Sequence, residues 1–407
     1  MKKKFLFILT LVALVISCAK KKDPVPTPPP VVVPPGVTGL TKTNVKQYMV
    51  DSNATKQTIA LFYNLKTLTK IGFAVGQHDA FSGFFNNTGG MSDIKKTTGN
   101  DPALLGSDFM FITDKSNDGR ASNWFYQQEV AIINHVKKAY GLGMINIFCW
   151  HLREPYNENS FYASEMTATE KANAFKSILP GGANHNWFKL KLDKVASVFN
   201  NLKGTGGELI PVIFRPFHEF DGSWFWWGAN FCTEEEFKTG FKFTVEYLRD
   251  TKGVRNVLYS FSPDNSYDTQ AKYLSRYPGD AYVDVLGIDN YWDLRRGAGQ
   301  AGAALANTKM KVVSDLAKTK VKIAAMTETG YQVTPTTPPV TGWFSNYLYS
   351  TITTNVEVSF VMFWSNGGTG YYVPPPSGAN ATDFIEFANK PKALLQNELP
   401  KMYVLPN

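Results

Sequence analysis

The chain has 407 residues, of which 43% are hydrophobic and 14% aromatic, enough for one large domain or two ordinary ones. Its formal charge of +8 does not indicate a nucleic-acid partner, because six lysines and one aspartate within the first 23 residues account for all but +3 of it. No basic run lies among the aromatic residues of the remainder, so we expect no nucleic-acid binding.

The first residues have the pattern of a secretory signal peptide. Lysines at positions 2–4 precede an apolar segment, residues 5–16, that is too short to span a membrane as a stable helix. The sequence Val-Ile-Ser-Cys at residues 15–18 resembles a bacterial lipobox, whose cysteine becomes the lipidated first residue of the mature protein. We therefore expect a signal peptide over residues 1–17 and an exported bacterial lipoprotein, held at the outer membrane or periplasmic face only by lipid on Cys18. An ordinary signal peptide with an incidental cysteine is the alternative.

A proline-rich spacer follows the cysteine. Residues 24–35 consist of proline, valine and threonine, a composition that favours an extended polyproline chain. At about 3.1 Å per residue this chain reaches roughly 37 Å. We expect the lipidated Cys18 and this linker to occupy residues 18–36. No second linker or repeat follows Gly36, so residues 37–407 are expected to form one domain.

Short apolar or β-branched runs alternate with amphipathic segments through that domain. The runs are residues 71–75, 103–107, 144–150, 209–214, 257–261, 283–288, 322–326 and 358–363. The helical patterns are residues 124–139, 187–202, 234–249, 301–317, 342–350 and 382–394. Eight strands that alternate with helices predict an α/β fold, a (β/α)8 TIM barrel with a single catalytic domain. Its functional residues would gather on the loops after the strands.

Two glutamates follow strands of this predicted barrel. Glu219 comes after the fourth run and Glu328 after the seventh, so both would reach the same mouth. Tryptophans follow Glu219 within residues 215–228, and an indole face can stack on a pyranose ring. Glycoside hydrolysis uses two carboxyl groups, about 5 to 5.5 Å apart in retaining enzymes and about 6.5 to 9.5 Å apart in inverting ones. The pattern predicts a sugar-cleaving cleft.

The residues around both glutamates carry a family resemblance. Arg-Pro-Phe-His-Glu-Phe-Asp-Gly-Ser-Trp-Phe-Trp-Trp-Gly at residues 215–228, together with Thr-Glu-Thr-Gly at residues 327–330, resembles glycoside hydrolase family 26. The best-known members of that family are endo-β-1,4-mannanases. The resemblance implies a double displacement with Glu219 as acid/base and Glu328 as nucleophile. It also implies β-mannan, as mannan, glucomannan or galactomannan, or manno-oligosaccharides as the substrate. We expect no metal, no organic cofactor and a monomer.

Further candidates for substrate binding are basic, acidic or aromatic side chains at strand ends. They are Arg215, His151, His218, Trp224, Asp289, Tyr291 and Trp364. By the resemblance, His151 belongs to the glycone site, His218 stands beside the acid/base and Tyr291 binds the nucleophile. Trp224 and Trp364 would flank the cleavage point.

Two of these candidates rest on their chemistry alone. Arg215, if buried in a barrel, needs a carboxylate for its planar guanidinium. Asp289 is a candidate ligand for a sugar hydroxyl. A structural role is the alternative for an isolated histidine, tyrosine or tryptophan at a strand end.

Other substrates and functions stay open at this stage. β-1,3-Xylanases and mixed-linkage β-glucanases share the catalytic frame, although His151 and the paired Trp226 and Trp227 favour mannan. A non-catalytic glycan-binding lipoprotein would not need both glutamates. A metal-dependent hydrolase would need clustered ligands, and no His-x-His pair follows the first run.

Two structural questions also stay open. Cleavage inside a chain or from its end depends on loop lengths, above all on the long segment 152–186. Cys149 and Cys232 could form a disulfide in an exported protein, but the sequence does not supply the geometry.

Overall fold

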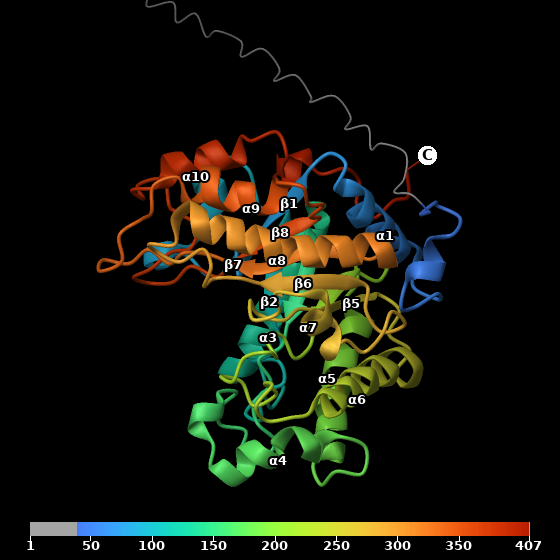
Figure 1. The fold of residues 1–407 in the computed structure, drawn as a ribbon. Helices are drawn as coiled ribbons and strands as arrows, with labels where there is room; N and C mark the ends of the chain where they lie inside the picture. The colour runs from blue at the N-terminus through green and yellow to red at the C-terminus, as the bar shows by residue number, and fades with distance from the viewer. Residues whose placement is uncertain (1–38, 407) are drawn as a thin grey trace, which may run out of the picture. The chain divides into compact units, whose positions relative to one another are not determined.

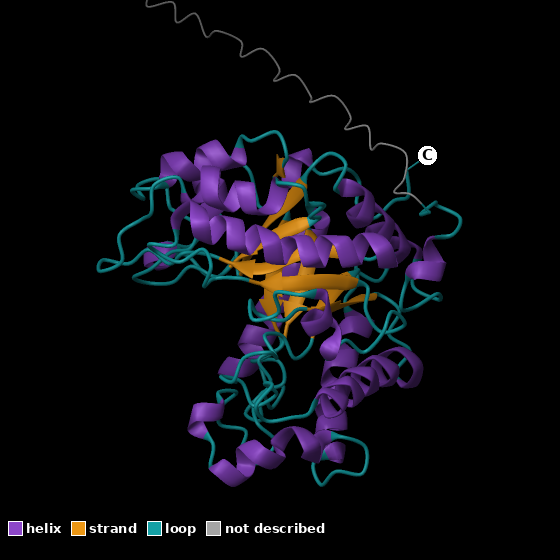
Figure 2. Cartoon of the chain, viewed as in Figure 1, coloured by secondary structure: helices purple, strands orange, loops and turns teal. Residues whose placement is uncertain are grey.

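The computed structural model describes residues 39–406, in which strands form a closed central barrel with helices packed outside it (Figures 1 and 2). The predicted TIM barrel is therefore confirmed. The predicted signal peptide, Cys18 and the spacer up to residue 36 lie outside the described residues. Within residues 39–406, no helix combines the length and the apolar character needed to cross a membrane.

Eight parallel strands close the barrel in sequence order. They are β1 (Phe73–His78), β2 (Leu104–Asp108), β3 (Ile145–Cys149), β4 (Val212–Arg215), β5 (Val257–Phe261), β6 (Val285–Asp289), β7 (Ile323–Thr329) and β8 (Phe360–Phe363). Closure occurs at β1, where Gly76 pairs with Leu104 on one side and Met362 on the other. A two-residue strand, β9 (Ala393–Leu394), pairs with the start of β1. Each of the eight barrel strands overlaps one of the eight predicted runs, and β9 was not predicted.

The helices lie between the strands and outside them. They are α1 (Lys56–Leu68), α2 (Asp93–Thr98), α3 (Trp124–Gly141), α4 (Ala168–Ile178), α5 (His185–Asn201), α6 (Glu234–Glu246), α7 (Gln270–Ser275), α8 (Gly299–Lys320), α9 (Tyr349–Thr353) and α10 (Ala381–Ala388). Two π-helical turns, Tyr247–Thr251 and Trp343–Leu348, extend α6 and precede α9. The helix predicted over residues 382–394 ends early because Pro391 cannot continue it.

Helix α4 lies within the long segment between β3 and α5, and its start has a local cause. The Thr167 hydroxyl accepts from the backbone N–H of Glu170, whose carboxylate accepts from the N–H of Thr167. Thr233 and Glu236 form the same capping box at the start of α6. Each box satisfies backbone donors that the first turn of a helix leaves free.

Alternate residues of each strand face opposite sides of the barrel wall. In β7, Ile323 and Ala325 belong to the cluster inside the barrel, while Ala324 and Met326 pack under the outer helices. The inner cluster includes Leu61 and other apolar side chains of α1, which close the amino-terminal end of the barrel. The functional cavity is therefore confined to the carboxyl ends of the strands.

The two cysteines left open by the sequence are not paired. Cys149 and Cys232 are both buried free thiols. Cys149 contacts Nε2 of His78 at 3.4 Å, whereas Cys232 contacts the guanidinium of Arg276 at 3.4 Å. Both thiols therefore have separate polar neighbours.

One buried carboxylate joins the amino-terminal segment to the barrel. Asp284, just before β6, accepts from the backbone N–H of Val50 at 2.8 Å and from that of Tyr259 at 2.9 Å. Its side chain is fully buried. Both donors would lose their partner if the carboxylate were removed.

We expect Asp284→Ala to lower the free energy of unfolding by about 2 to 4 kcal/mol, because it leaves two buried N–H groups unpaired. Thermal or urea unfolding followed by circular dichroism measures the loss. Asp315→Ala is the matched control, since Asp315 is a half-exposed residue of α8 whose carboxylate, among residues 39–406, pairs only with Lys311. Its effect should stay within about 0.5 kcal/mol, and equal losses in both variants would contradict the role given to Asp284.

Candidate active site

The segment after β4 holds Glu219 in a constrained backbone conformation. Phe217 and Glu219 both have φ of 52°, in the left-handed region that side chains rarely adopt. The backbone N–H of Glu219 donates to the carbonyl of Ser262, at the end of β5, at 2.9 Å. A backbone keeps such a strained conformation only where several surrounding contacts hold it there, and strained residues of this kind are typical of functional positions.

A β-bulge places Glu328 in the barrel mouth. Ile288 of β6 pairs with Met326 of β7, but the next residue, Asp289, pairs with Glu328, so Thr327 is the extra residue. A shift of one residue reverses the face of every following side chain. Without the bulge, Glu328 would point outward as Met326 does. Glu328 lies inside β7, not after it.

Arg215 is buried between two acidic side chains. Its guanidinium donates to Oε1 of Glu328 at 2.8 Å and to Oδ2 of Asp289 at 2.5 Å. It also donates to the hydroxyl of Ser262 at 3.0 Å. The other carboxylate oxygen of Glu328 accepts from the Tyr291 hydroxyl at 3.0 Å. Both oxygens of Glu328 therefore accept a hydrogen bond, which fixes the carboxylate in the barrel mouth.

Glu219 has the opposite environment. Burial raises its pKa well above the ordinary value, and the negative charges of Glu328 and Asp289 raise it further. The indole N–H of Trp224 donates to Oε2 of Glu219 at 2.7 Å, which partly offsets the rise. The direction of this shift suits a general acid, which must hold a proton until the glycosidic oxygen takes it.

The acidic side chains lie close together. Glu219, Asp289 and Glu328 each have a carboxylate oxygen within 4.8 Å of one belonging to each of the others. This proximity is consistent with the short carboxyl separation of retaining glycosidases and leaves little space for a water between them.

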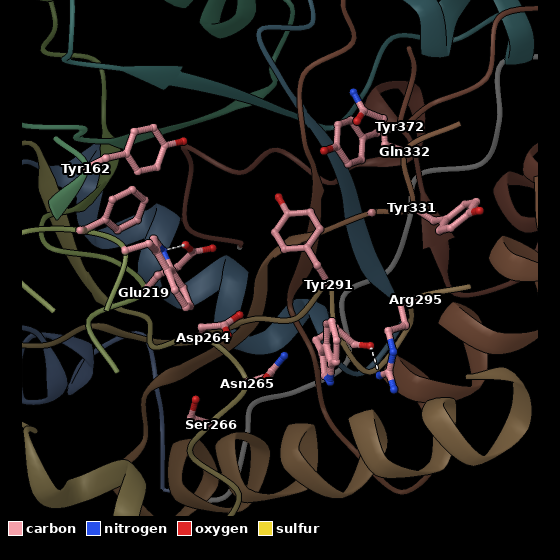
Figure 3. Close-up of a pocket in the computed structure, with 14 residues that line it drawn as sticks. Tyr162, Glu219, Asp264, Asn265, Ser266, Tyr291, Arg295, Tyr331, Gln332 and Tyr372 are labelled. Carbon is pink, nitrogen blue, oxygen red and sulfur yellow. Dashed lines mark hydrogen bonds between the residues drawn. The ribbon is translucent and has the colours of Figure 1, made fainter. Parts of the chain in front are cut away.

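Two cavities meet at this site and share Tyr162. The larger, of about 790 Å³, contains Glu219, Trp224 and Tyr291, which Figure 3 shows in part. The smaller, of about 370 Å³, contains His151 and Trp364. The cleft therefore extends to both sides of the carboxylates, with Trp224 on one side and Trp364 on the other.

The smaller cavity is built on paired rings and a short hydrogen bond. Nδ1 of His151 lies 2.5 Å from Oδ2 of Asp108, which fixes the imidazole. Burial opposes ionisation of Asp108, but the charge and hydrogen bond of His151 hold its pKa below the ordinary value. Trp364 stacks on His78, with ring centroids 4.4 Å apart.

Six of the predicted residues line neither cavity. Arg215, Asp289 and Glu328 are described above, and the oxygens of Asp289, the predicted ligand for a sugar hydroxyl, are bound by Arg215 and Thr327.

His218 is buried edge-on against His151, and burial, reinforced by nearby positive charge, lowers its pKa well below the ordinary value, so the ring is neutral. Trp226 and Trp227 are fully buried, and their indole N–H groups donate to the carbonyls of Leu152 and His218. The argument that these two tryptophans favour mannan is therefore wrong, because they face the core.

Other cavity residues carry no distinctive sequence pattern. The larger cavity is also lined by Tyr162, Asp264, Trp292, Arg295 and Tyr372. Burial, followed by the charge of Asp221, raises the pKa of Asp264 to about 7. Position after a strand could have identified Asp264 and Trp292. Tyr162 comes from the long β3–α5 segment, whose path the sequence does not show.

Two clusters within the described residues have donors close enough to share a metal ion. One contains Glu219, Asp289 and Glu328, and the other Asp108, Cys149 and His151. In the first, the guanidinium of Arg215 already neutralises part of the charge. In the second, the carboxylate and imidazole are bonded to each other. Neither set offers the open arrangement of a catalytic metal centre.

The geometry agrees with similarities to known proteins. The family model described as Glycosyl hydrolase family 26 matches residues 50–359. A mannan endo-1,4-beta-mannosidase of Bifidobacterium adolescentis is 33% identical over 366 residues, 86% of this chain and 35% of the relative. A Bacillus subtilis enzyme of the same name is 29% identical over 52% of this chain and 58% of its own. The chain thus spans between a third and three fifths of these two relatives.

Solved structures match over most of their length. GH26C from a Muricauda species is 52% identical, with a TM-score of 0.89 over 90% of this chain and 99% of its own. A modular endo-beta-1,4-mannanase from Cellulomonas fimi is 30% identical, with a TM-score of 0.79 over 87% of this chain and 79% of its own. With the family match over more than half of its residues, the chain belongs to glycoside hydrolase family 26.

Proposed function

We propose that this protein is a retaining glycoside hydrolase that cleaves β-1,4-mannosidic linkages in mannan, glucomannan or galactomannan and acts as a monomer. The observation that carries the proposal is the pair Glu219 and Glu328. Their carboxylate oxygens lie within 4.8 Å of each other, burial raises the pKa of Glu219, and Arg215 and Tyr291 donate to Glu328.

In the first step, Glu328 attacks the anomeric carbon while Glu219 gives its proton to the glycosidic oxygen. The bond to the leaving sugar breaks and a glycosyl ester of Glu328 forms. Arg215 and Tyr291 hold the attacking carboxylate in place. In the second step, Glu219, now ionised, removes a proton from water. That water attacks the same carbon and releases Glu328.

The substrate follows from the relatives, because the cleft itself fits several β-linked pyranoses. Three of the four relatives described above are named as mannan-cleaving enzymes, while the name of the Muricauda protein states no substrate. A shorter match, 30% identical over 24% of this chain, is named Endoglucanase H, from Acetivibrio thermocellus. A β-glucan is therefore the second candidate substrate. The cleft continues on both sides of the carboxylates, which supports cleavage inside a chain.

We also propose that the mature protein is an exported, membrane-anchored lipoprotein. The basic start, short apolar segment and cysteine of residues 1–18 support this localisation. The proline-rich spacer would hold the catalytic domain away from the membrane surface.

The wild-type enzyme should release reducing ends faster from β-mannan than from mixed-linkage glucan or β-1,3-xylan. Glu328→Ala should lower kcat by at least about a thousandfold, because the glycosyl group then has no carboxylate to accept it. Added azide should restore turnover in this variant and give an α-mannosyl azide, since azide attacks from the face that Glu328 vacates.

Two variants control this experiment. Glu219→Ala with an activated aryl mannoside and azide should give the β-azide, because the intermediate on Glu328 still forms. Glu386→Gln, on the exposed face of α10, should keep full activity. A β-azide from Glu328→Ala would contradict the role of Glu328 as nucleophile. If the wild-type enzyme releases reducing ends faster from glucan than from mannan, β-glucan is the substrate in place of mannan.

The pH profile should depend on Trp224. The indole N–H stabilises ionised Glu219, so Trp224→Phe raises the pKa of that carboxyl further. Because the acid must be protonated, kcat/KM falls as pH rises through this pKa, and the alkaline limb should move to higher pH. Trp364→Phe is the control, since it changes stacking without touching Glu219. If the alkaline limb of the Trp224→Phe profile stays at the wild-type pH, the hydrogen bond from Trp224 does not determine the pKa of Glu219.

Membrane attachment should depend on Cys18. Cys18→Ser removes the thiol that receives the lipid, so the expressed protein should lose fatty-acid labelling and move from the membrane fraction to the soluble fraction. Cys232→Ser keeps the lipid site and should stay with the membrane. A labelled, membrane-bound Cys18→Ser protein would show that the lipoprotein proposal is wrong.

A further inference from the structure

Trp292 is a large, solvent-exposed aromatic side chain in the cavity that contains Glu219. It follows β6 by three residues, lines the larger cavity and is 62% exposed. This exposure means that core packing does not account for the tryptophan. An exposed indole at the rim of a sugar cleft is well suited to stack on a ring of the ligand.

Arg295 holds this indole in one orientation. Its guanidinium lies over the Trp292 ring, 4.0 Å from the centroid, and donates to the Trp292 carbonyl at 2.7 Å. Among residues 39–406, the side-chain interactions of Arg295 are those with Trp292, so its position depends on the tryptophan. With one face covered by the guanidinium, the opposite face of the indole is available to a ligand. A ring fixed in advance loses little entropy when it binds.

The position of the pair relative to Glu219 identifies which part of the substrate it meets. The leaving sugar must lie beside Glu219, because this residue protonates the oxygen that departs. Figure 3 shows Glu219 on one side of Tyr291 and Arg295 on the other, within the same cavity. Its volume of about 790 Å³ is near the upper end of the range for ligand sites. The cavity therefore extends past the first leaving sugar towards Trp292.

Polar groups of the same cavity suit the hydroxyl groups of a sugar ring. Asn265, Ser266 and Gln332 line the same cavity, and the guanidinium of Arg295 has further N–H donors. A flat apolar face with hydrogen-bonding groups around it matches a pyranose, which has C–H faces and hydroxyl groups at its rim.

We propose that Trp292, braced by Arg295, forms a binding subsite for a β-1,4-linked hexopyranose on the leaving-group side, at least one unit beyond the sugar next to the scissile bond. This inference rests on the proposed function. The subsite sets the cleavage register, which is the position along the substrate chain of the bond that is cleaved. A chain gains the contact with the indole only when it is bound so that it extends past Glu219 to Trp292.

Hydrolysis of mannopentaose in water enriched in oxygen-18 tests the subsite. The heavy oxygen enters the new reducing end, so the masses of the labelled products give the frequency of each register. In the wild type, registers that place two or more sugars on the leaving-group side should dominate. Trp292→Ala should reduce them about tenfold relative to the register with one, which corresponds to about 1.4 kcal/mol. Trp292→Phe should restore most of this preference.

Arg295→Met should shift the registers in the same direction by a smaller factor, because the indole stays but loses its brace. Leu190→Ala, at an exposed side chain of α5, is the matched control and should leave the registers unchanged.

Unchanged registers in Trp292→Ala would overturn the subsite. An equal fall in kcat/KM for all substrate lengths would then show that Trp292 acts through its neighbour Tyr291. A wild-type enzyme that does not cleave mannopentaose but cleaves another β-glycan would overturn the proposed substrate and this mannosyl subsite together.

Discussion

The buried guanidinium of Arg215 is the interaction on which the site depends. Glu328 and Asp289 lie close together in a dry barrel mouth, and the guanidinium between them donates to an oxygen of each. Burial raises the pKa of Asp289 well above its ordinary value, and the positive charge of Arg215 opposes that rise. A single arginine does not balance a third carboxylate. Burial raises the pKa of Glu219, and the charges of Glu328 and Asp289 raise it further, so Glu219 holds its proton more readily than an exposed glutamate does.

The barrel provides the geometry for this charge balance, with two local departures from regularity. Arg215 reaches from β4 to β6 and β7, which is possible only where the inner side chains of several strands converge. The bulge at Thr327 turns Glu328 inward, and left-handed φ angles at Phe217 and Glu219 set the acid. The same bulge places Thr327 next to Asp289, and the Thr327 hydroxyl donates to Oδ1 of Asp289 at 2.6 Å.

The sequence was sufficient for the fold because apolar runs and amphipathic segments follow simple periods, and all eight runs became strands. It also indicated both glutamates by their position after strands. The period of two alone would have directed Glu328 outward, and no residue type announces the bulge that reverses it. Similarly, three nearby tryptophans looked alike in sequence. Only the folded loop separates Trp224, which meets the cavity, from Trp226 and Trp227, which do not.

The buried tryptophans nevertheless contribute to the chemistry through the loop they fix. Trp226 ties the segment after β4 to the carbonyl of Leu152, after β3, and Trp227 closes the segment on the carbonyl of His218. Because His218 precedes Glu219, the second bond restrains the backbone at the acid itself. A loop held at both points can present the indole of Trp224 to Glu219 at 2.7 Å without paying ordering entropy during each turnover. The buried Trp226 and Trp227 thus contribute by restraining the loop that carries Glu219 and Trp224.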